Sequence, residues 1–283
     1  MNPHVNTIAG RLSLRQPQRD SLEILARLCD IVPMEKNAGV EKALKAIQSE
    51  YASVTDFERD FPSVCFALAT GVGKTRLMGA FIAYLFKAEG IRNFFVLAPN
   101  LTIYNKLIAD FTPNTSKYVF QGIAEFAVNA PEIITGDNYE SGRGVRDERR
   151  RQKRLAFDYD DRVHVNIFNI SKITSTETPK GAAKSKIPRF RRLQEYIGQS
   201  YFEYLSKLDD LVLLMDESHR YRASAGMKAI GELKPILGLE LTATPQVERG
   251  GDTQPFQNVI YSYPLSSAMT DGFVKEPAVA TRV

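Results

Sequence analysis

The apolar residues of this 283-residue chain follow two kinds of pattern. Continuous apolar runs, which are typical of strands buried on both faces of a sheet, occupy 63–69, 93–98, 163–170, 211–215, 239–242 and 258–263, with weaker strand candidates at 118–121 and 132–135. Helical spacing of apolar residues predicts helices at 18–30, 40–51, 76–87, 101–111, 189–207, 225–234 and 265–271. The alternation of strands and helices predicts an α/β fold, with a mostly parallel sheet and helices on both faces.

A glycine-rich turn, Leu68-Ala69-Thr70-Gly71-Val72-Gly73-Lys74-Thr75, joins the first strong strand to the helix after it. Glycines let such a loop fold tightly around phosphate oxygens, and the backbone N–H groups and the start of the next helix face the anion. Lys74 would reach the β- and γ-phosphates, and the Thr75 hydroxyl would hold Mg²⁺. Leu68 departs from the general pattern, which has glycine at that position. The loop predicts a nucleotide site formed by residues 70–75.

An acidic pair, Asp216 and Glu217, ends the apolar strand 211–215. Ligands of open α/β sheets bind at the carboxyl ends of the strands, so Asp216 is expected beside the phosphate loop. There it would bind Mg²⁺ directly or through water, and Glu217 would activate the attacking water as a general base. The alternative, an ordinary helix N-cap, is disfavoured because the pair follows a phosphate loop in the same predicted sheet.

The net charge of +4 is distributed unevenly. Residues 141–154 carry a net charge of +5 and residues 180–192 a net charge of +6, which leaves −7 for the rest of the chain. They fall within two polar stretches, 137–162 and 171–192, which we interpret as insertions. Such segments suit a polyanion such as nucleic acid, or they are solvated loops that keep the protein soluble.

The remaining composition is that of an ordinary globular protein. Neither a membrane-spanning stretch nor a secretion signal is recognisable, so we expect no membrane association and a cytoplasmic location. Cys29 and Cys65 form no metal or disulfide pattern, and Cys65, inside an apolar run, is predicted to be a buried core residue.

Four further blocks accompany the phosphate loop, in order: Leu14-Arg15-Gln16-Pro17-Gln18, Val96-Leu97-Ala98-Pro99-Asn100, Asp216-Glu217-Ser218-His219 and Leu241-Thr242-Ala243-Thr244-Pro245. Together they resemble the motifs of superfamily 2 DEAD/DEAH-box helicases and translocases. The resemblance implies a RecA-like P-loop NTPase domain with ATP and Mg²⁺ as its cofactors.

The same resemblance assigns roles to residues outside the phosphate loop. Gln18 would contact the adenine edge, with Arg15 as an alternative nucleotide contact. His219, Thr242 and Thr244 would couple the nucleotide site to the nucleic acid. Each role has a plain structural alternative: a helix-terminal glutamine, a surface histidine, and threonines that favour a strand.

Nucleic-acid contacts are expected along the second block. Pro99, Asn100 and Thr102 would lie against a nucleic-acid strand, the last two by hydrogen bonds to phosphates from the start of a helix. Tyr221 and Arg222, just after the acidic box, are predicted to be exposed candidates for phosphate or base contacts.

The segments MDESHRYRASAG, LGLELTATP and YSYPLSSAMTDGFVKEP resemble the helicase–nuclease (Res) subunit of type III restriction–modification enzymes. That implies double-stranded DNA and a modification methyltransferase as partners. We expect an N-terminal helical region at 1–60, a RecA-like domain at 61–250, and at 251–283 the start of a linker toward a second RecA-like domain. This second domain and a nuclease domain have no recognisable motifs in this chain.

Two functions remain open at this point. The chain is either the ATPase domain of a DNA translocase or a non-catalytic fragment that binds ATP and DNA, because an arginine finger would have to come from the second domain. A DNA-repair or RNA helicase of the same superfamily would share the same site.

Overall fold

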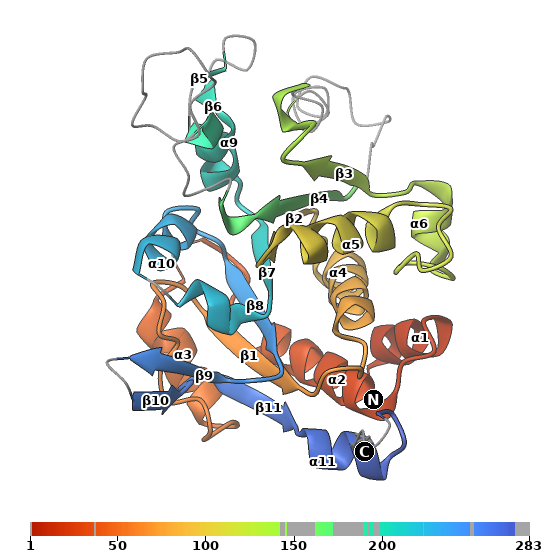
Figure 1. Cartoon of the computed structure of the whole chain (residues 1–283), viewed down its shortest axis with the longest axis vertical. Helices are drawn as coiled ribbons and strands as arrows, with labels where there is room; N and C mark the ends of the chain where they lie inside the picture. Colours follow the sequence, from red (N-terminus) through yellow and green to blue (C-terminus); the bar gives the residue numbers. More distant parts are fainter. Residues whose placement is uncertain are drawn as a thin grey trace, which may run out of the picture.

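A computed structural model describes residues 2–36, 38–141, 145, 162–171, 189–191, 193–194, 199–222, 224–249 and 252–274. A seven-stranded sheet forms its centre, in the order β11-β1-β8-β7-β2-β4-β3 (Figure 1). Its strands are β1 (Ser63–Leu68), β2 (Asn93–Ala98), β3 (Glu132–Thr135), β4 (His164–Asn169), β7 (Leu211–Asp216), β8 (Leu237–Thr242) and β11 (Val259–Tyr263). Each neighbouring pair in this sheet is parallel.

Alternate residues of the central strands pack into two cores, one on each face of the sheet. In β2, Phe94 and Val96 belong to one core, whereas Phe95 and Leu97 belong to the other. This explains why the strands are continuously apolar, since both faces are covered. The α/β prediction, with helices on both faces, is therefore confirmed.

In the described residues, six helices supply the first core: α1 (Pro3–Arg11), α2 (Gln16–Ile31), α3 (Val40–Gln48), α4 (Lys74–Glu89), α5 (Leu101–Phe111) and α6 (Ala124–Val128). The second core is covered by α9 (Tyr201–Lys207) and α10 (Ser224–Gly231). Figure 1 shows α1 and α2 beside α4, and α11 (Leu265–Thr270) near the start of α2. Cys65, on β1, is fully buried, as expected.

Two predicted elements are wrong. Residues 118–121 form a turn rather than a strand, because Tyr118 and Phe120 anchor it through edge-on aromatic contacts, Phe120 with Phe111 and Phe126. The predicted helix 189–207 is instead a 3₁₀ turn at 189–191, a short antiparallel pair, β5 (Leu193–Gln194) with β6 (Gln199–Ser200), and only then α9. The Ser200 hydroxyl accepts a hydrogen bond from the Glu203 N–H and so begins the helix late.

Three elements were not predicted: α1, α6 (Ala124–Val128) and the hairpin of β9 (Gln246–Arg249) with β10 (Asp252–Pro255). The signal for α1 is present in Asn2-Pro3, since the Asn2 side chain caps the helix and proline occupies its first turn. The basic stretches 137–162 and 171–192 fall largely outside the described residues. Among the residues that the structure describes, no helix has the length and apolar character that crossing a membrane requires.

Candidate functional site

The phosphate-loop sequence lies between the carboxyl end of β1 and the first turn of α4. Gly71 and Gly73 have φ values of +86° and +99°, a backbone conformation that favours glycine. Val72 between them is fully buried, whereas Thr70 is exposed. Lys74 and Thr75 form the start of α4, so both side chains leave the helix beside the loop.

Gln18 braces this loop from α2. Its Nε2 donates to the Gly73 carbonyl at 2.9 Å, while its Oε1 accepts from the Arg15 backbone N–H at 2.8 Å. The Arg15 guanidinium donates to the Gly71 carbonyl at 2.8 Å and lies over the Phe273 ring. Gln18 is buried and both ends of its amide are engaged within the protein. In this structure Gln18 and Arg15 therefore hold the loop through one N–H donor each.

The acidic pair arrives beside the loop, as the strand order requires. Because β8 lies between β1 and β7, the ends of all three strands are neighbours. The Lys74 ammonium lies 3.1 Å from Glu217 Oε1. Glu217 has a φ of +50°, which is uncommon for a residue other than glycine and marks local strain at this point of the chain.

Asp216 is buried, and its Oδ1 has no hydrogen-bond partner. Burial, reinforced by the neighbouring Glu217, raises the pKa of Asp216 to about 6, although Lys74 and Lys106 oppose the change. A buried carboxylate oxygen without a partner fits a cation, and the Thr75 hydroxyl at the start of α4 is a second candidate ligand. In the part of the chain that the structure describes, no three His, Cys, Asp or Glu side chains form a metal site. Mg²⁺ usually takes one or two protein ligands together with phosphate oxygens, and Thr75 and Asp216 are the candidates for the protein ligands here.

His219, Thr242 and Thr244 form one connected group with Glu217. His219 Nδ1 lies 2.9 Å from the Thr242 hydroxyl, 3.3 Å from the Thr244 hydroxyl and 3.6 Å from Glu217 Oε2. The Thr242 hydroxyl is also 3.5 Å from Glu217. Burial lowers the pKa of His219, although Glu217 opposes the change, and so favours its neutral imidazole. Two of the predicted coupling residues, His219 and Thr242, thus lie beside the predicted base, and Thr244 reaches it only through His219 and Thr242.

The Lys106 side chain, from α5, reaches the same region and was missed by sequence reasoning. Its ammonium donates to the Thr75 hydroxyl at 3.1 Å and lies 3.5 Å from Asp110 on the same helix. No sequence signal singles it out, since a lysine four residues before an aspartate is typical of an exposed helical pair.

Pro99, Asn100 and Thr102 lie at the carboxyl end of β2 and the start of α5. The Asn100 side chain accepts from the Ile103 N–H at 2.9 Å and caps the helix, while Thr102 is exposed. Leu101 beside them is 63% exposed. This edge is accessible to a partner, although the Asn100 oxygen already has a structural role.

The prediction that Tyr221 and Arg222 are exposed is wrong, because both are buried. Arg222 pairs with Glu58, donates to Glu240 at 2.9 Å and to Asn258 at 3.1 Å, and lies over the Phe256 ring. The segment after the acidic box thus turns inward to a buried ionic cluster, which explains why these polar residues are not on the surface.

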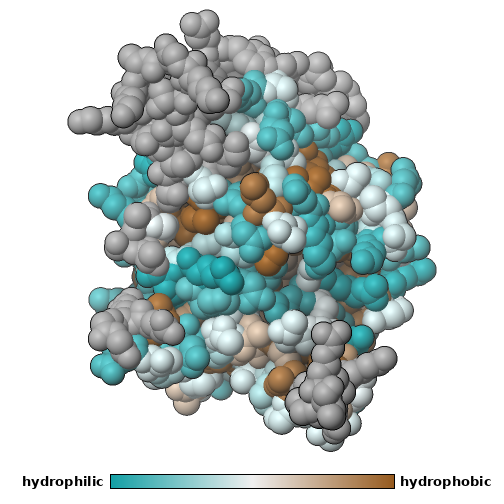
Figure 2. Space-filling view, viewed as in Figure 1, coloured by the Kyte–Doolittle hydropathy of each residue, from teal (hydrophilic) through white to brown (hydrophobic). Residues whose placement is uncertain are grey.

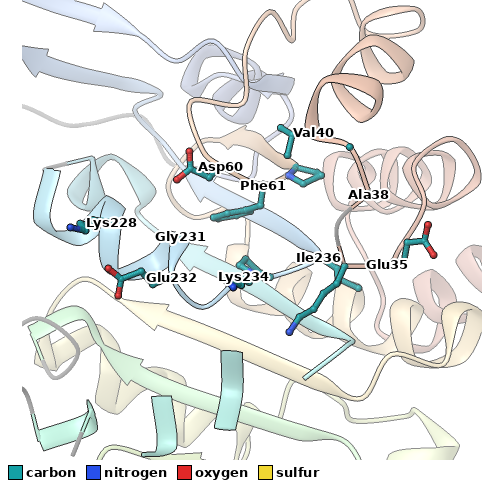
Figure 3. A pocket seen from close by; sticks show the side chains of 14 residues that line it. Glu35, Ala38, Val40, Asp60, Phe61, Lys228, Gly231, Glu232, Lys234 and Ile236 are labelled. Atoms are coloured by element: carbon teal, nitrogen blue, oxygen red, sulfur yellow. The ribbon is translucent and has the colours of Figure 1, made fainter. Parts of the chain in front are cut away.

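Outside the phosphate-loop region, the structure has a further feature of note, a pocket at the opposite edge of the sheet. A pocket of about 620 Å³ lies where β1 and β8 begin, at the edge of the sheet opposite the phosphate loop. Figure 3 shows Phe61 and Ile236 within it and Lys228 and Glu232 at its side. Hydrophilic residues cover most of the face seen in Figure 2, with hydrophobic residues scattered rather than joined in one patch.

Residues 12–247 match the family described as type III restriction enzyme, res subunit. This chain belongs to that family. The match spans the phosphate loop, the acidic box and the Thr242–Thr244 segment, and it confirms the resemblance to a Res-like motor domain of superfamily 2. The α/β sheet described above is accordingly that of a RecA-like domain.

Three known proteins are similar to parts of this chain. The ATP-dependent Type ISP restriction–modification enzyme LlaBIII, solved bound to DNA, is 13% identical over 92% of this chain and 16% of its own, with a TM-score of 0.50. The Sulfolobus solfataricus SWI2/SNF2 ATPase core in complex with dsDNA is 15% identical over 83% of this chain and 33% of its own, with a TM-score of 0.42. Mitochondrial chaperone ClpB4 of Arabidopsis thaliana is 27% identical over 160 residues, 56% of this chain and 14% of its own.

At these identities the likeness to LlaBIII shows the fold alone. The chain spans well under two thirds of each of these three relatives.

Proposed function

We propose that this chain is an ATP-dependent motor domain of a DNA translocase or helicase, in the Res subunit of a type III restriction enzyme. The observation that carries the proposal is the 3.1 Å contact between Lys74 and Glu217. It joins the phosphate loop to the acidic box at one sheet edge, as ATP hydrolysis requires. Family membership and the DNA complex of LlaBIII support DNA as the polyanion.

In the proposed mechanism, the backbone of residues 70–73 and the start of α4 bind the phosphates, and Lys74 leaves Glu217 for the γ-phosphate. Thr75 and Asp216 would hold Mg²⁺, which would neutralise charge on the phosphates. Glu217, released from Lys74, would then orient the attacking water and accept its proton.

His219, Thr242 and Thr244 would report the state of Glu217 to the DNA-binding edge at Pro99, Asn100 and Thr102. The first part of this route is supported by contacts: His219 and Thr242 lie beside Glu217, and Thr244 contacts His219.

The domain limits enter as part of the proposal. Residues 1–60 would form a helical region that braces the phosphate loop, residues 61–250 the RecA-like domain, and residues 251–283 the start of a linker. A second RecA-like domain, a nuclease domain and a modification methyltransferase would be the partners. An arginine finger from the second domain would contribute on the order of 10³–10⁵ in rate.

The test is steady-state ATP hydrolysis by this chain, without nucleic acid, with double-stranded DNA and with RNA. Lys74→Ala and Glu217→Gln serve as site variants. DNA-stimulated turnover that both variants lose would support an active motor. Nucleotide binding that Lys74→Ala abolishes, without turnover, would support the alternative of a non-catalytic ATP- and DNA-binding domain. Stimulation by RNA alone would favour an RNA helicase, and loss of all nucleotide binding would contradict the proposal.

A further inference from the structure

Lys106 occupies a position that an ordinary surface lysine does not. It lies in the second turn of α5, and its ammonium donates to the hydroxyl of Thr75, 31 residues away in the chain. Its side chain is 57% exposed, whereas Asp110, its other partner at 3.5 Å, is only 9% exposed. The lysine thus connects α5 to α4. An ion pair with Asp110 alone would involve only α5.

The contact with Thr75 involves an oxygen that the proposed function assigns to Mg²⁺. The charge of Lys106 also acts on Asp216, the other candidate ligand, whose Oδ1 has no hydrogen-bond partner. One ammonium therefore contacts Thr75 and acts electrostatically on Asp216, the two groups of the candidate metal site. An ammonium and a divalent cation repel each other strongly at separations of a few ångströms, so the two would not share this space.

We propose that Lys106 is a positioning residue that supplies the cation of this site in the nucleotide-free protein and moves to Asp110 when Mg²⁺ binds with nucleotide. The inference rests on the proposed function. It adds Lys106, which belongs to none of the motifs, and a competition between its ammonium and Mg²⁺. The move is short, because Asp110 is already 3.5 Å away and rotation about the side-chain bonds of the lysine is sufficient. Lys106 would then oppose Mg²⁺ and moderate its affinity.

The experiment measures binding rather than turnover. The dissociation constant of a fluorescent ADP analogue is determined in EDTA and in excess MgCl₂, and the ratio of the two values reports the contribution of Mg²⁺. In Lys106→Gln, Mg²⁺ no longer has to displace a cation, so the ratio is expected to rise about fivefold over wild type. Lys106→Arg keeps the charge and should keep the wild-type ratio.

Two further variants sharpen the result. Lys42→Gln removes the same charge from an exposed position in α3 and should leave the ratio unchanged. Asp110→Asn removes the alternative partner, so Lys106 stays at Thr75 and the ratio should fall below wild type. A rise in this variant would overturn the part of the proposal that concerns Asp110.

The outcomes separate this proposal from the proposed function. An unchanged ratio in Lys106→Gln, or an equal rise in Lys106→Arg, would overturn the role of the lysine charge while nucleotide binding that depends on Lys74 still stood. Absence of nucleotide binding by the wild-type chain, with and without Mg²⁺, would overturn the proposed function and this inference together.

Discussion

Replacing Glu240 by glutamine is expected to cost several kcal/mol of stability, although the change is nearly isosteric. Glu240 lies on β8 with no exposed surface. It accepts hydrogen bonds from Arg59 at 2.9 Å and Arg222 at 2.9 Å, and both guanidinium groups are themselves 1% exposed. Ser63 and Asn258 donate to it as well. Glutamine would leave the buried Arg59 facing a neutral group and would leave Arg222 with Glu58 as its carboxylate partner.

The magnitude follows from the ionisation of this carboxyl. Burial opposes the charge most strongly, but Arg59 and Arg222 together outweigh it and lower the pKa of Glu240 from 4.5 to about 2. That change corresponds to about 3 kcal/mol of stability at neutral pH. Breaking a buried pair by removing one partner costs about 3–5 kcal/mol, in agreement with this value. Because the folded pKa is depressed, the contribution is complete above pH 4.5 and is lost as pH falls through about 2.

The assay is urea unfolding of wild type and Glu240→Gln at pH 7 and at pH 3, with Glu41→Gln, at an exposed position in α3, as the control. We expect a loss of about 3–5 kcal/mol at pH 7, which shrinks by about 2 kcal/mol at pH 3. The control should change by less than about 0.5 kcal/mol. A loss below about 1 kcal/mol at pH 7, or one that does not depend on pH, would refute the reasoning.

Three further predictions concern the nucleotide site. Burial and Glu217 raise the pKa of Asp216 from 3.8 to about 6, so the ionised form destabilises the fold, and stability is lost as pH rises through about 6. Asp216→Asn should therefore raise the unfolding free energy at pH 8 by up to about 3 kcal/mol, and a melting temperature lower than wild type at that pH would contradict this. Gly73 has a φ of +99°, and a Cβ there would lie 2.7 Å from the Gln18 side-chain amide. Gly73→Ala should therefore lower the free energy of unfolding in urea by at least about 1 kcal/mol. Gly10→Ala is the control and should not, because a Cβ at Gly10 would meet open space. Thr242→Val removes the hydroxyl that contacts the imidazole of the acidic box, and should lower DNA-stimulated turnover about tenfold while nucleotide affinity, measured by titration, stays within about twofold. Equal losses of affinity and turnover would show that the hydroxyl only supports binding.

The sequence determined the features that depend on neighbours in the chain. A strand, a glycine-rich turn and a helix follow one another between residues 63 and 89, and the positive φ values of Gly71 and Gly73 are local properties of that turn. The apolar runs predicted the buried strands because both faces of the sheet are covered. The order of the motifs was sufficient to indicate the family, which the match over residues 12–247 then confirmed.

Local pattern failed where tertiary contacts decide. Tyr118 and Phe120 have strand-like spacing, yet they fix a turn because their rings pack against neighbouring aromatic residues rather than in a sheet. Arg222 has the polarity of a surface residue, yet the buried Glu240 and the half-buried Glu58 supply the negative charge that compensates for its desolvation. Such partners lie far away in the sequence, so hydropathy alone does not predict that one segment forms a turn or that the other residue is buried.

The composition of the candidate site also belongs to the tertiary structure. Insertion of β8 between β1 and β7 brings Thr242 beside Glu217, and packing of α5 beside α4 brings Lys106 to Thr75. The sequence by itself determined which residues carry phosphate and metal chemistry, since a loop of a few residues and one strand end encode them. Only the fold decided which cations and hydroxyls surround those residues, because strand order and helix packing set distances that no local spacing contains.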